Sequence, residues 1–258
     1  GDRGRDGVQL TPSWQLLYGD AREVLKSLPS ESVQCIITDP PYNIGKNFGR
    51  GKEYDNRLDY IDWLWSVWRE CSRVAEKGSF LVYTNIIRHL RYAFYPPEPW
   101  VFRTVGVWHK PLSLGPTYYG IGLHWEPVII WSKGTPWRPF RSLRVFSNVF
   151  IANVVSGTKR NGLREHPTVK PESLLHQLIS FAAPPEGVIL DPFVGSGTTV
   201  LVAKKLGRSA VGIDLNLKYL ELARKRLEMV SLPLILPGSL GAQRIEETQP
   251  AMKGASNG

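Results

Sequence analysis

Four consecutive residues, Asp39-Pro40-Pro41-Tyr42, combine hydrogen-bond acceptors with a flat aromatic ring. Adjacent prolines fix the backbone φ angle and remove two amide donors, so the carbonyl groups around them stay free to accept hydrogen bonds. Asp39 adds a carboxylate acceptor, and Tyr42 adds a ring face for stacking. This set suits a planar group that donates hydrogen bonds, such as the exocyclic amine of a base. A proline-rich turn with a helix-capping aspartate would have the same sequence, and spacing alone does not separate the two interpretations.

A second stretch, Ile-Leu-Asp-Pro-Phe-Val-Gly-Ser-Gly-Thr-Thr at 189–199, lies between an expected strand and an expected helix. Gly195 and Gly197 allow a tight turn and a close approach of the backbone to a ligand, with helix amides facing it. A phosphate-binding loop would need lysine soon after the last glycine, but threonines follow, so that class is excluded. Asp214 ends the next expected strand, where it can accept hydrogen bonds from ribose hydroxyls. Together these residues indicate a nucleoside-containing cofactor, although the glycines alone also fit an ordinary strand-to-helix turn.

Both stretches follow short apolar runs that end abruptly at a polar residue. Along the chain, such β-branched runs alternate with helical patterns, which predicts an α/β domain with a mostly parallel sheet. Strands are predicted at 14–18, 33–38, 80–83, 102–108, 128–131, 188–190 and 210–213. Helices are predicted at 21–28, 59–75, 86–94, 171–183, 198–206 and 216–229, with proline as the first residue of the fourth. The strands at 102–108 and 128–131 are expected to be antiparallel at one edge.

The composition of the 258 residues, 42% hydrophobic and 21% charged, is that of a globular domain with a large core. Its only cysteines, Cys35 and Cys71, exclude a disulfide framework and a cysteine-rich zinc site, and no metal is expected. No apolar run approaches the roughly 20 residues of a membrane helix, and residues 1–7 lack the apolar core of a signal peptide. The first residue is Gly, so we expect an initiator or tag to have been removed. These features predict a cytoplasmic protein with no membrane partner.

The net charge of +9 favours an anionic partner such as nucleic acid. Most of the excess positive charge lies in residues 133–165, which contain seven basic residues and one acidic residue, Glu165. Aromatic residues are interspersed among them. The seven are Lys133, Arg138, Arg141, Arg144, Lys159, Arg160 and Arg164. This composition suits phosphate contacts and insertion into a DNA groove, and the alternative is a solvated basic loop.

Three motifs follow one another in the chain: the tetrapeptide, then His-Pro-Thr-Val-Lys-Pro at 166–171, then the glycine stretch. In this order they resemble the motifs of the permuted β class of amino-directed DNA methyltransferases. Those enzymes act on adenine N6 or cytosine N4, and the resemblance covers about residues 16–229. It implies a Rossmann-like S-adenosylmethionine-dependent methyltransferase fold with a mostly parallel seven-stranded sheet, circularly permuted, and a small inserted target-recognition segment. The implied divisions are flexible tails at 1–13 and 231–258, a catalytic half at 14–132, the target-recognition segment at 133–165 and a cofactor-binding half at 166–230.

The resemblance also assigns individual residues. The catalytic residues would be Asp39, Pro40, Pro41 and Tyr42. Those around S-adenosylmethionine would be Asp20, Thr168, Lys170, Asp191, Phe193, Gly195, Ser196, Gly197, Thr198, Thr199 and Asp214. Asp20 would lie near the cofactor's adenine, but it can equally be a helix N-cap alone. Lys170 can pair with the cofactor carboxylate or be a solvated lysine at a helix start, and His166 has the alternative of a buried core histidine.

The implied reaction is direct in-line methyl transfer to N6 of an adenine flipped out of double-stranded DNA and stacked on Tyr42. Hydrogen bonds to Asp39 and the Pro40 carbonyl would localise the lone pair of the amine and position it. Cytosine C5 methylation needs a thiolate and is excluded, since Cys35 and Cys71 are predicted core residues. Aspartate at the head of the tetrapeptide favours adenine. Cytosine N4 is the first alternative, and a catalytically silent DNA-binding subunit is the second. Because the recognition segment is short, either the target is short or the second subunit of a homodimer shares the reading.

Overall fold

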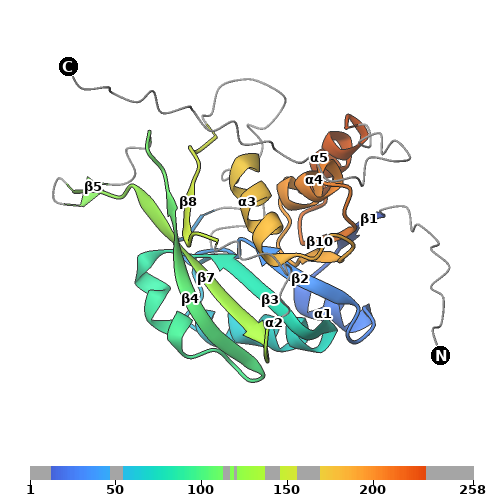
Figure 1. Cartoon of the computed structure of the whole chain (residues 1–258), viewed down its shortest axis with the longest axis horizontal. Helices are drawn as coiled ribbons and strands as arrows, with labels where there is room; N and C mark the ends of the chain where they lie inside the picture. Colours follow the sequence, from blue (N-terminus) through green and yellow to red (C-terminus); the bar gives the residue numbers. More distant parts are fainter. Residues whose placement is uncertain are drawn as a thin grey trace, which may run out of the picture.

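The computed structural model describes residues 13–46, 55–112, 117–118, 121–136, 146–155 and 169–230. These form an eight-stranded sheet with helices on both faces, beside a separate two-stranded ribbon (Figure 1). The sheet comprises β1 (Trp14–Tyr18), β2 (Val33–Thr38), β3 (Ala75–Thr84), β4 (Trp100–His109), β7 (Trp125–Lys133), β8 (Val149–Ile151), β9 (Ile189–Asp191) and β10 (Ala210–Asp214). The ribbon comprises β5 (Thr117–Tyr118) and β6 (Ile121–Gly122). The helices are α1 (Ala21–Ser27), α2 (Tyr60–Val74), the 3₁₀ helix η2 (Ile87–Phe94), α3 (Glu172–Ala182), α4 (Thr198–Lys205) and α5 (Leu217–Glu228).

The strand order is β1-β10-β9-β2-β3-β7-β4-β8. Neighbouring strands from β1 to β3 are parallel, whereas β7 runs antiparallel to both β3 and β4. The prediction of an α/β fold with a mostly parallel sheet and an antiparallel pair is therefore confirmed. The last two strands of the chain lie between β1 and β2, an order compatible with the expected circular permutation, which stays a prediction.

Three local predictions differ from the structure. The sheet has eight strands rather than seven, because β8 pairs in parallel with β4 inside the segment 133–165, where no strand was predicted. Only Phe150 of β8 is buried, so three residues give too little alternation to be recognised. The helix expected at 86–94 is a 3₁₀ helix, and Pro171 is the N-cap of α3 with extended backbone rather than its first helical residue.

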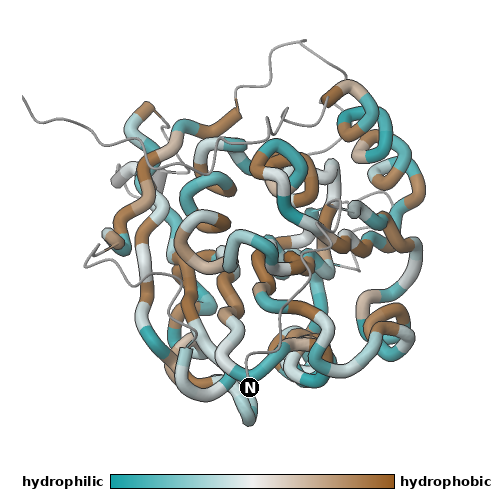
Figure 2. The backbone as a smooth tube through the Cα atoms, turned by 45° about the vertical axis from the view of Figure 1, so that its right-hand side comes forward, coloured by the Kyte–Doolittle hydropathy of each residue, from teal (hydrophilic) through white to brown (hydrophobic). Residues whose placement is uncertain are grey.

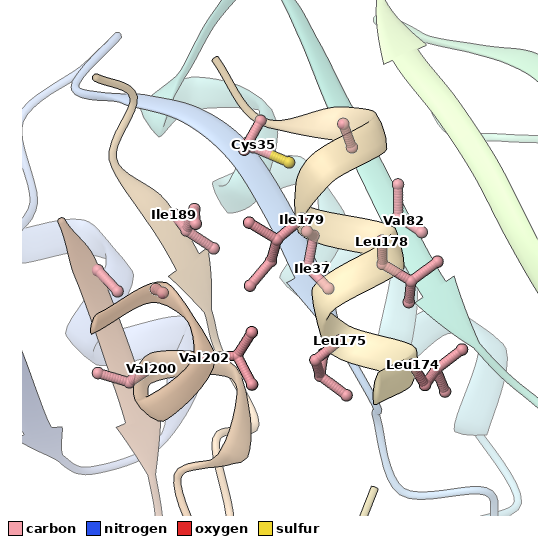
Figure 3. Packing of buried hydrophobic residues seen from close by; sticks show 14 of the residues in the cluster. Cys35, Ile37, Val82, Leu174, Leu175, Leu178, Ile179, Ile189, Val200 and Val202 are labelled. Atoms are coloured by element: carbon pink, nitrogen blue, oxygen red, sulfur yellow. The ribbon is translucent and has the colours of Figure 1, made fainter. Parts of the chain in front are cut away.

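The central strands are buried on both faces, which explains their almost continuous apolar sequences (Figure 2). Cys35, Ile37 and Val82 belong to the core under α3, α4 and α5, and Figure 3 shows them beside the apolar side chains of α3. Ile36 and Leu81 point to the opposite face, where α1, α2 and η2 cover the sheet. Within the part of the chain that the structure describes, no helix is long and apolar enough to cross a membrane.

Each parallel strand delivers a polar residue to the same edge of the sheet. Asp214 and Asp191 end β10 and β9, and Thr84 ends β3. Asp20 follows β1 by two residues, and Asp39 follows β2 directly. Because the carboxyl ends of parallel strands share one edge, these five side chains gather where ligands of open α/β sheets bind.

At Gly197 the glycine loop packs closely against α5. Its φ of 81° favours glycine, and a Cβ atom there would lie 2.5 Å from the Cβ of Ala223. Gly207 has a similar φ of 66° but open space around it. We expect Gly207→Ala to lower the free energy of unfolding by about 1–2 kcal/mol through backbone strain. Gly197→Ala should lower the free energy of unfolding by about 1–3 kcal/mol more than Gly207→Ala does, because its added Cβ atom overpacks against Ala223.

Urea unfolding of both variants measures the difference. Equal decreases would contradict the close contact between the loop and α5.

Candidate active site

One continuous pocket opens at this edge, between the glycine loop and the tetrapeptide. The predicted residues that line it are Asp20, Asp39, Pro40, Pro41, Tyr42, Lys170, Asp191, Phe193, Gly195, Ser196, Thr198, Thr199 and Asp214. Gly197 does not line the pocket, because it packs behind the loop against α5. Thus the two stretches that carry chemistry in the sequence lie on opposite sides of one cavity.

Asp214 fixes the glycine loop to the end of β10. One of its carboxylate oxygens accepts a hydrogen bond from the Gly195 amide at 2.9 Å, and the other accepts one from the Asn216 amide at 2.7 Å. Burial raises the pKa of Asp214, and the amide hydrogen bonds oppose that rise. The positive φ of Gly195, 50°, lets its amide turn toward the carboxylate.

Arg226 of α5 supports the start of α4 from behind. Its guanidinium donates to the carbonyl of Ser196 at 2.6 Å and to the hydroxyl of Thr198 at 3.1 Å. These two loop residues are therefore held by a cation from another helix, which the sequence motif did not reveal.

Asp191 lies at the floor of the pocket and is 3% exposed. Its Oδ1 accepts hydrogen bonds from the Thr38 hydroxyl at 2.5 Å and from the Phe193 amide at 3.0 Å. Burial raises the pKa of Asp191 to about 6 despite these hydrogen bonds. The carboxyl group therefore changes charge near neutral pH.

The helix-cap role that was left open for Asp20 is confirmed, whereas its place near the cofactor's adenine stays a prediction. It caps α1, since Oδ1 accepts a hydrogen bond from the Arg22 amide at 2.9 Å, and it also lines the pocket. The Arg22 guanidinium lies 2.9 Å from Oδ2. Hydrogen bonding to Arg22 holds the pKa of Asp20 below its ordinary value, although partial burial raises it.

Both oxygens of the Asp39 carboxylate have partners. Oδ1 accepts hydrogen bonds from the Tyr42 hydroxyl at 2.6 Å and from the Thr84 hydroxyl. Oδ2 lies 2.7 Å from the ammonium of Lys170. Lys170 therefore lies against the tetrapeptide, with its side chain only 13% exposed, and is not a solvated lysine.

The backbone carbonyls of the tetrapeptide are engaged unequally. The Pro41 carbonyl accepts a hydrogen bond from the Tyr60 hydroxyl at 2.8 Å. The Tyr42 carbonyl lies 3.1 Å from Nε2 of His89, whose pKa is lowered by burial. The Pro40 carbonyl accepts no hydrogen bond from any residue in the described ranges. It is thus the acceptor that remains available.

The chain after the tetrapeptide wraps around Asp55, which is 1% exposed. Its carboxylate accepts hydrogen bonds from the amides of Asn43, Ile44 and Lys46 at 2.6, 3.1 and 2.9 Å. Asn43 adopts a positive φ of 58° at this turn. Sequence reasoning missed Asp55, because an aspartate in an irregular stretch gives no periodic signal.

Glu126 and Lys110 were also missed. Glu126 lies 2.9 Å from the Tyr42 hydroxyl through Oε2 and 2.8 Å from the Lys110 ammonium through Oε1. Burial alone would raise the pKa of Glu126, but Lys170 and Lys110 outweigh it and hold the pKa below its ordinary value. An acid at the start of an apolar strand was the available signal.

Most of the residues predicted to contact DNA lie outside the described ranges, namely Arg138, Arg141, Arg144, Lys159, Arg160 and Arg164. His166 and Thr168 also lie outside these ranges. Lys133 is described, and it lies at the opposite edge of the sheet from the pocket, because β7 is antiparallel to β3. Its ammonium contacts the Ala75 carbonyl at 2.7 Å and Glu31 at 3.4 Å. The structure therefore does not bring Lys133 to the site.

The fold and the pocket together are those of an enzyme that binds a nucleoside-containing cofactor at the carboxyl ends of the parallel strands. A family model described as DNA methylase, of N6/N4 type, matches residues 33–225, and the chain belongs to this family. The DNA adenine methyltransferase YhdJ of Escherichia coli K12 is 30% identical over 245 residues, which cover 84% of this chain and 83% of YhdJ.

Two solved structures share the fold. A complex of M1.HpyAVI with S-adenosylmethionine has a TM-score of 0.65 at 24% identity, covering 84% of this chain and 100% of that one. The cytosine-N4-specific PvuII methyltransferase has a TM-score of 0.69 at 21% identity, covering 86% of this chain and 89% of that one. The protein is a DNA methyltransferase of the amino-directed family that uses S-adenosylmethionine.

The pocket residues fit this cofactor, which supplies an electrophilic methyl group on a sulfonium when bound. Asp191 and Asp214 offer carboxylates to cationic and hydroxyl groups, and neither has a basic side chain in contact among the described residues. Phe193 and Trp63 form an aromatic wall, with ring centroids 5.6 Å apart. The carboxylates and the wall would hold a cationic ligand that carries a flat ring.

Cofactor affinity should depend on the charge of Asp191. With a pKa raised to about 6, the carboxyl is ionised at pH 7.5 and mostly protonated at pH 5. Attraction for a cationic ligand is therefore lost as the pH falls through about 6. We expect titration calorimetry to show several-fold weaker binding of S-adenosylmethionine at pH 5.

Asp191→Asn should bind more weakly at pH 7.5 and lose most of this pH dependence. Asp62→Asn, an exposed position on α2, should keep it. Constant wild-type affinity from pH 7.5 to pH 5 would contradict the role of Asp191.

Proposed function

We propose that this enzyme methylates N6 of an adenine flipped out of double-stranded DNA. The observation that carries the proposal is that the Asp39 carboxylate and the Pro40 carbonyl both line the pocket, and that the Pro40 carbonyl accepts no hydrogen bond from the described residues. Two acceptors side by side match the two hydrogens of an exocyclic amine. Aspartate at the head of the tetrapeptide favours adenine, and YhdJ, the relative at 30% identity, is named as an adenine methyltransferase.

The two acceptors would activate the amine by hydrogen bonding. The nitrogen is a poor nucleophile because its lone pair is conjugated into the ring. Hydrogen bonds from its two N–H groups to Asp39 and the Pro40 carbonyl would localise that lone pair and hold it in line for attack. Positioning and electrostatic stabilisation are the main contributions that these residues can make, because no covalent intermediate is needed. Asp39, which would hold a hydrogen bond from the amine, would also accept the proton that the methylated nitrogen must lose.

Tyr42 would be the stacking platform for the flipped base. Its hydroxyl is held by Asp39 and Glu126, which fixes the position of the ring. Flipping costs a few kcal/mol, which stacking and pocket contacts must offset. A fixed ring can stack without losing rotamer freedom at that moment.

The thiol route to cytosine C5 methylation finds no support in the structure. Cys35 and Cys71 are both buried, and burial raises the pKa of each thiol. A protonated thiol in the core cannot serve as the nucleophile.

Cytosine N4 is the second candidate, since cytosine also presents an exocyclic amine. The similarity to the PvuII enzyme, named as cytosine-N4-specific, lies at 21% identity and concerns the fold. The same acceptors would serve either amine, so the product must be identified directly.

Incubation with labelled S-adenosylmethionine and unmethylated genomic DNA, followed by mass spectrometry of the nucleosides, identifies the target. We expect N6-methyladenine. N4-methylcytosine would replace this proposal by the second candidate, and label only in RNA or protein would overturn it.

Asp39→Ala should reduce methyl transfer by at least about 100-fold, on the scale of removing one preorganised polar group from an active site. Cofactor binding should persist, because Asp191 and Asp214 are intact. Single-turnover transfer and calorimetry on the same preparation measure the two effects. Normal turnover by the variant would contradict the mechanism.

Apart from Lys133, the basic residues of the segment 133–165 remain the predicted DNA contact, and a homodimer that shares target reading remains a prediction. Replacing Arg138, Arg141 and Arg144 with Gln should weaken DNA binding. It should also lower the slope of log affinity against log salt by about 1 for each phosphate group that is no longer neutralised. Fluorescence anisotropy at several salt concentrations measures the slope.

Lys133→Gln is the matched control, since its ammonium is bound at the opposite edge of the sheet. Its slope should equal that of the wild type. An unchanged slope in the triple variant would exclude those arginines from phosphate contact.

A further inference from the structure

The acceptor that the target amine needs is already occupied in the free protein. Asp39 Oδ1 accepts hydrogen bonds from Tyr42 and Thr84, and Oδ2 is paired with Lys170. A carboxylate offers about four lone-pair sites, and these donors occupy three of them. The amine therefore competes for Asp39 with three donors and with the positive charge of Lys170, and its hydrogen bond to Asp39 strengthens when one of these donors turns away. Turning away is costly in a buried site unless another acceptor is within reach.

The Tyr42 hydroxyl has a second acceptor in Glu126. A phenol has one hydrogen to donate, and burial keeps the pKa of Tyr42 well above its ordinary value, so that hydrogen stays in place. Asp39 Oδ1 lies at 2.6 Å and Glu126 Oε2 at 2.9 Å from the same oxygen. Rotation about the C–O bond exchanges one acceptor for the other without moving the ring.

Lys170 has the same pair of alternatives. Its ammonium lies 2.7 Å from Asp39 Oδ2 and 3.8 Å from Glu126 Oε2. It also donates to the Tyr42 hydroxyl at 3.0 Å, which holds it between the two carboxylates. A small shift of the ammonium therefore replaces the Asp39 ion pair by a Glu126 ion pair.

Glu126 itself is held in place by Lys110. The ammonium of Lys110, a residue that is 6% exposed, lies 2.8 Å from Oε1 of Glu126. The other oxygen of Glu126, Oε2, therefore stays directed at Tyr42 and Lys170. Two lysines and two carboxylates form this group, and their formal charges cancel. Moving hydrogen bonds within the group leaves its total charge unchanged.

We propose that Glu126 is a positioning residue that frees Asp39 for the target amine. It takes over the Tyr42 hydrogen bond and the Lys170 ion pair when the base enters, and the Asp39 carboxylate then accepts from the amine. This inference rests on the proposed function, because it assumes an amine donor at Asp39. No proton leaves the group and no bond to carbon forms in this exchange.

Glu126→Gln is the sharpest test, because glutamine keeps the size and an acceptor oxygen but removes the charge that attracts Lys170. We expect kcat to fall by about 10- to 100-fold, the scale of a misplaced reacting group. The KM for DNA and the Kd for S-adenosylmethionine should change by less than about threefold, since Glu126 does not line the cofactor pocket.

Glu70→Gln is the matched control. Glu70 also pairs with a cation, Arg73 at 3.1 Å on the next turn of α2, but unlike Glu126 it forms no hydrogen bond or ion pair with Tyr42 or Lys170 in the part of the chain that the structure describes. Its kcat should stay within about twofold of the wild type. Thermal unfolding of both variants separates a loss of kcat from a loss of folding.

The ammonium resonance of Lys170 in ¹H–¹⁵N spectra gives a readout that needs no DNA. A buried, ion-paired ammonium exchanges slowly, and Lys170→Gln assigns the signal. The resonance should shift in Glu126→Gln and stay in place in Glu70→Gln. Glu126→Asp should move kcat part of the way back toward the wild type by restoring the charge.

Wild-type kcat in Glu126→Gln, or an unchanged Lys170 resonance, would overturn the role of Glu126. A wild-type protein that methylates no DNA would overturn the proposed function instead. In that case the Lys170 resonance would still decide whether Glu126 and Lys170 are coupled.

Discussion

The pairing of β2 with β9 joins the two halves of the site, which lie far apart in the sequence. Cys35 lies opposite Ile189 and Ile36 opposite Leu190, all four fully buried. This register brings the Thr38 hydroxyl to the Asp191 carboxylate at 2.5 Å. A slip by one residue would turn Thr38 and its neighbours to the other face of the sheet. The distance between the glycine loop and the tetrapeptide is therefore set by a strand register that the buried core enforces.

Charge is distributed differently on the two sides of the pocket. On the cofactor side, Asp191 and Asp214 accept hydrogen bonds from amides and hydroxyls, so their negative charge is available to a cation. On the tetrapeptide side, Asp39 and Glu126 are balanced by lysines. A cationic cofactor and a neutral base need these two environments. Burial strengthens the electrostatic interactions on both sides of the pocket, because charges interact more strongly where water is excluded.

Elements with strong periodicity were predictable from the sequence. The helix expected at 59–75 is observed as Tyr60–Val74, because seven of its residues face the core at helical spacing. The strand expected at 14–18 is observed with the same ends. In contrast, β8 has one inward side chain, Phe150, and no periodicity can be recognised in three residues. Predictability therefore followed the length of the segment that carries a pattern rather than burial alone, since no residue of β1 is buried.

The sequence by itself determined the chemical groups and their local setting: the acceptors of the tetrapeptide, the glycines of the turn and the order of the motifs. These depend on φ and ψ preferences and on neighbours along the chain. Only the tertiary structure decided which distant charges meet. Lys170 reaches Asp39 and Glu126 reaches Lys170, whereas Lys133 lies at the opposite edge because β7 is antiparallel. Strand order and direction follow from burying the whole core, and no local pattern encodes them.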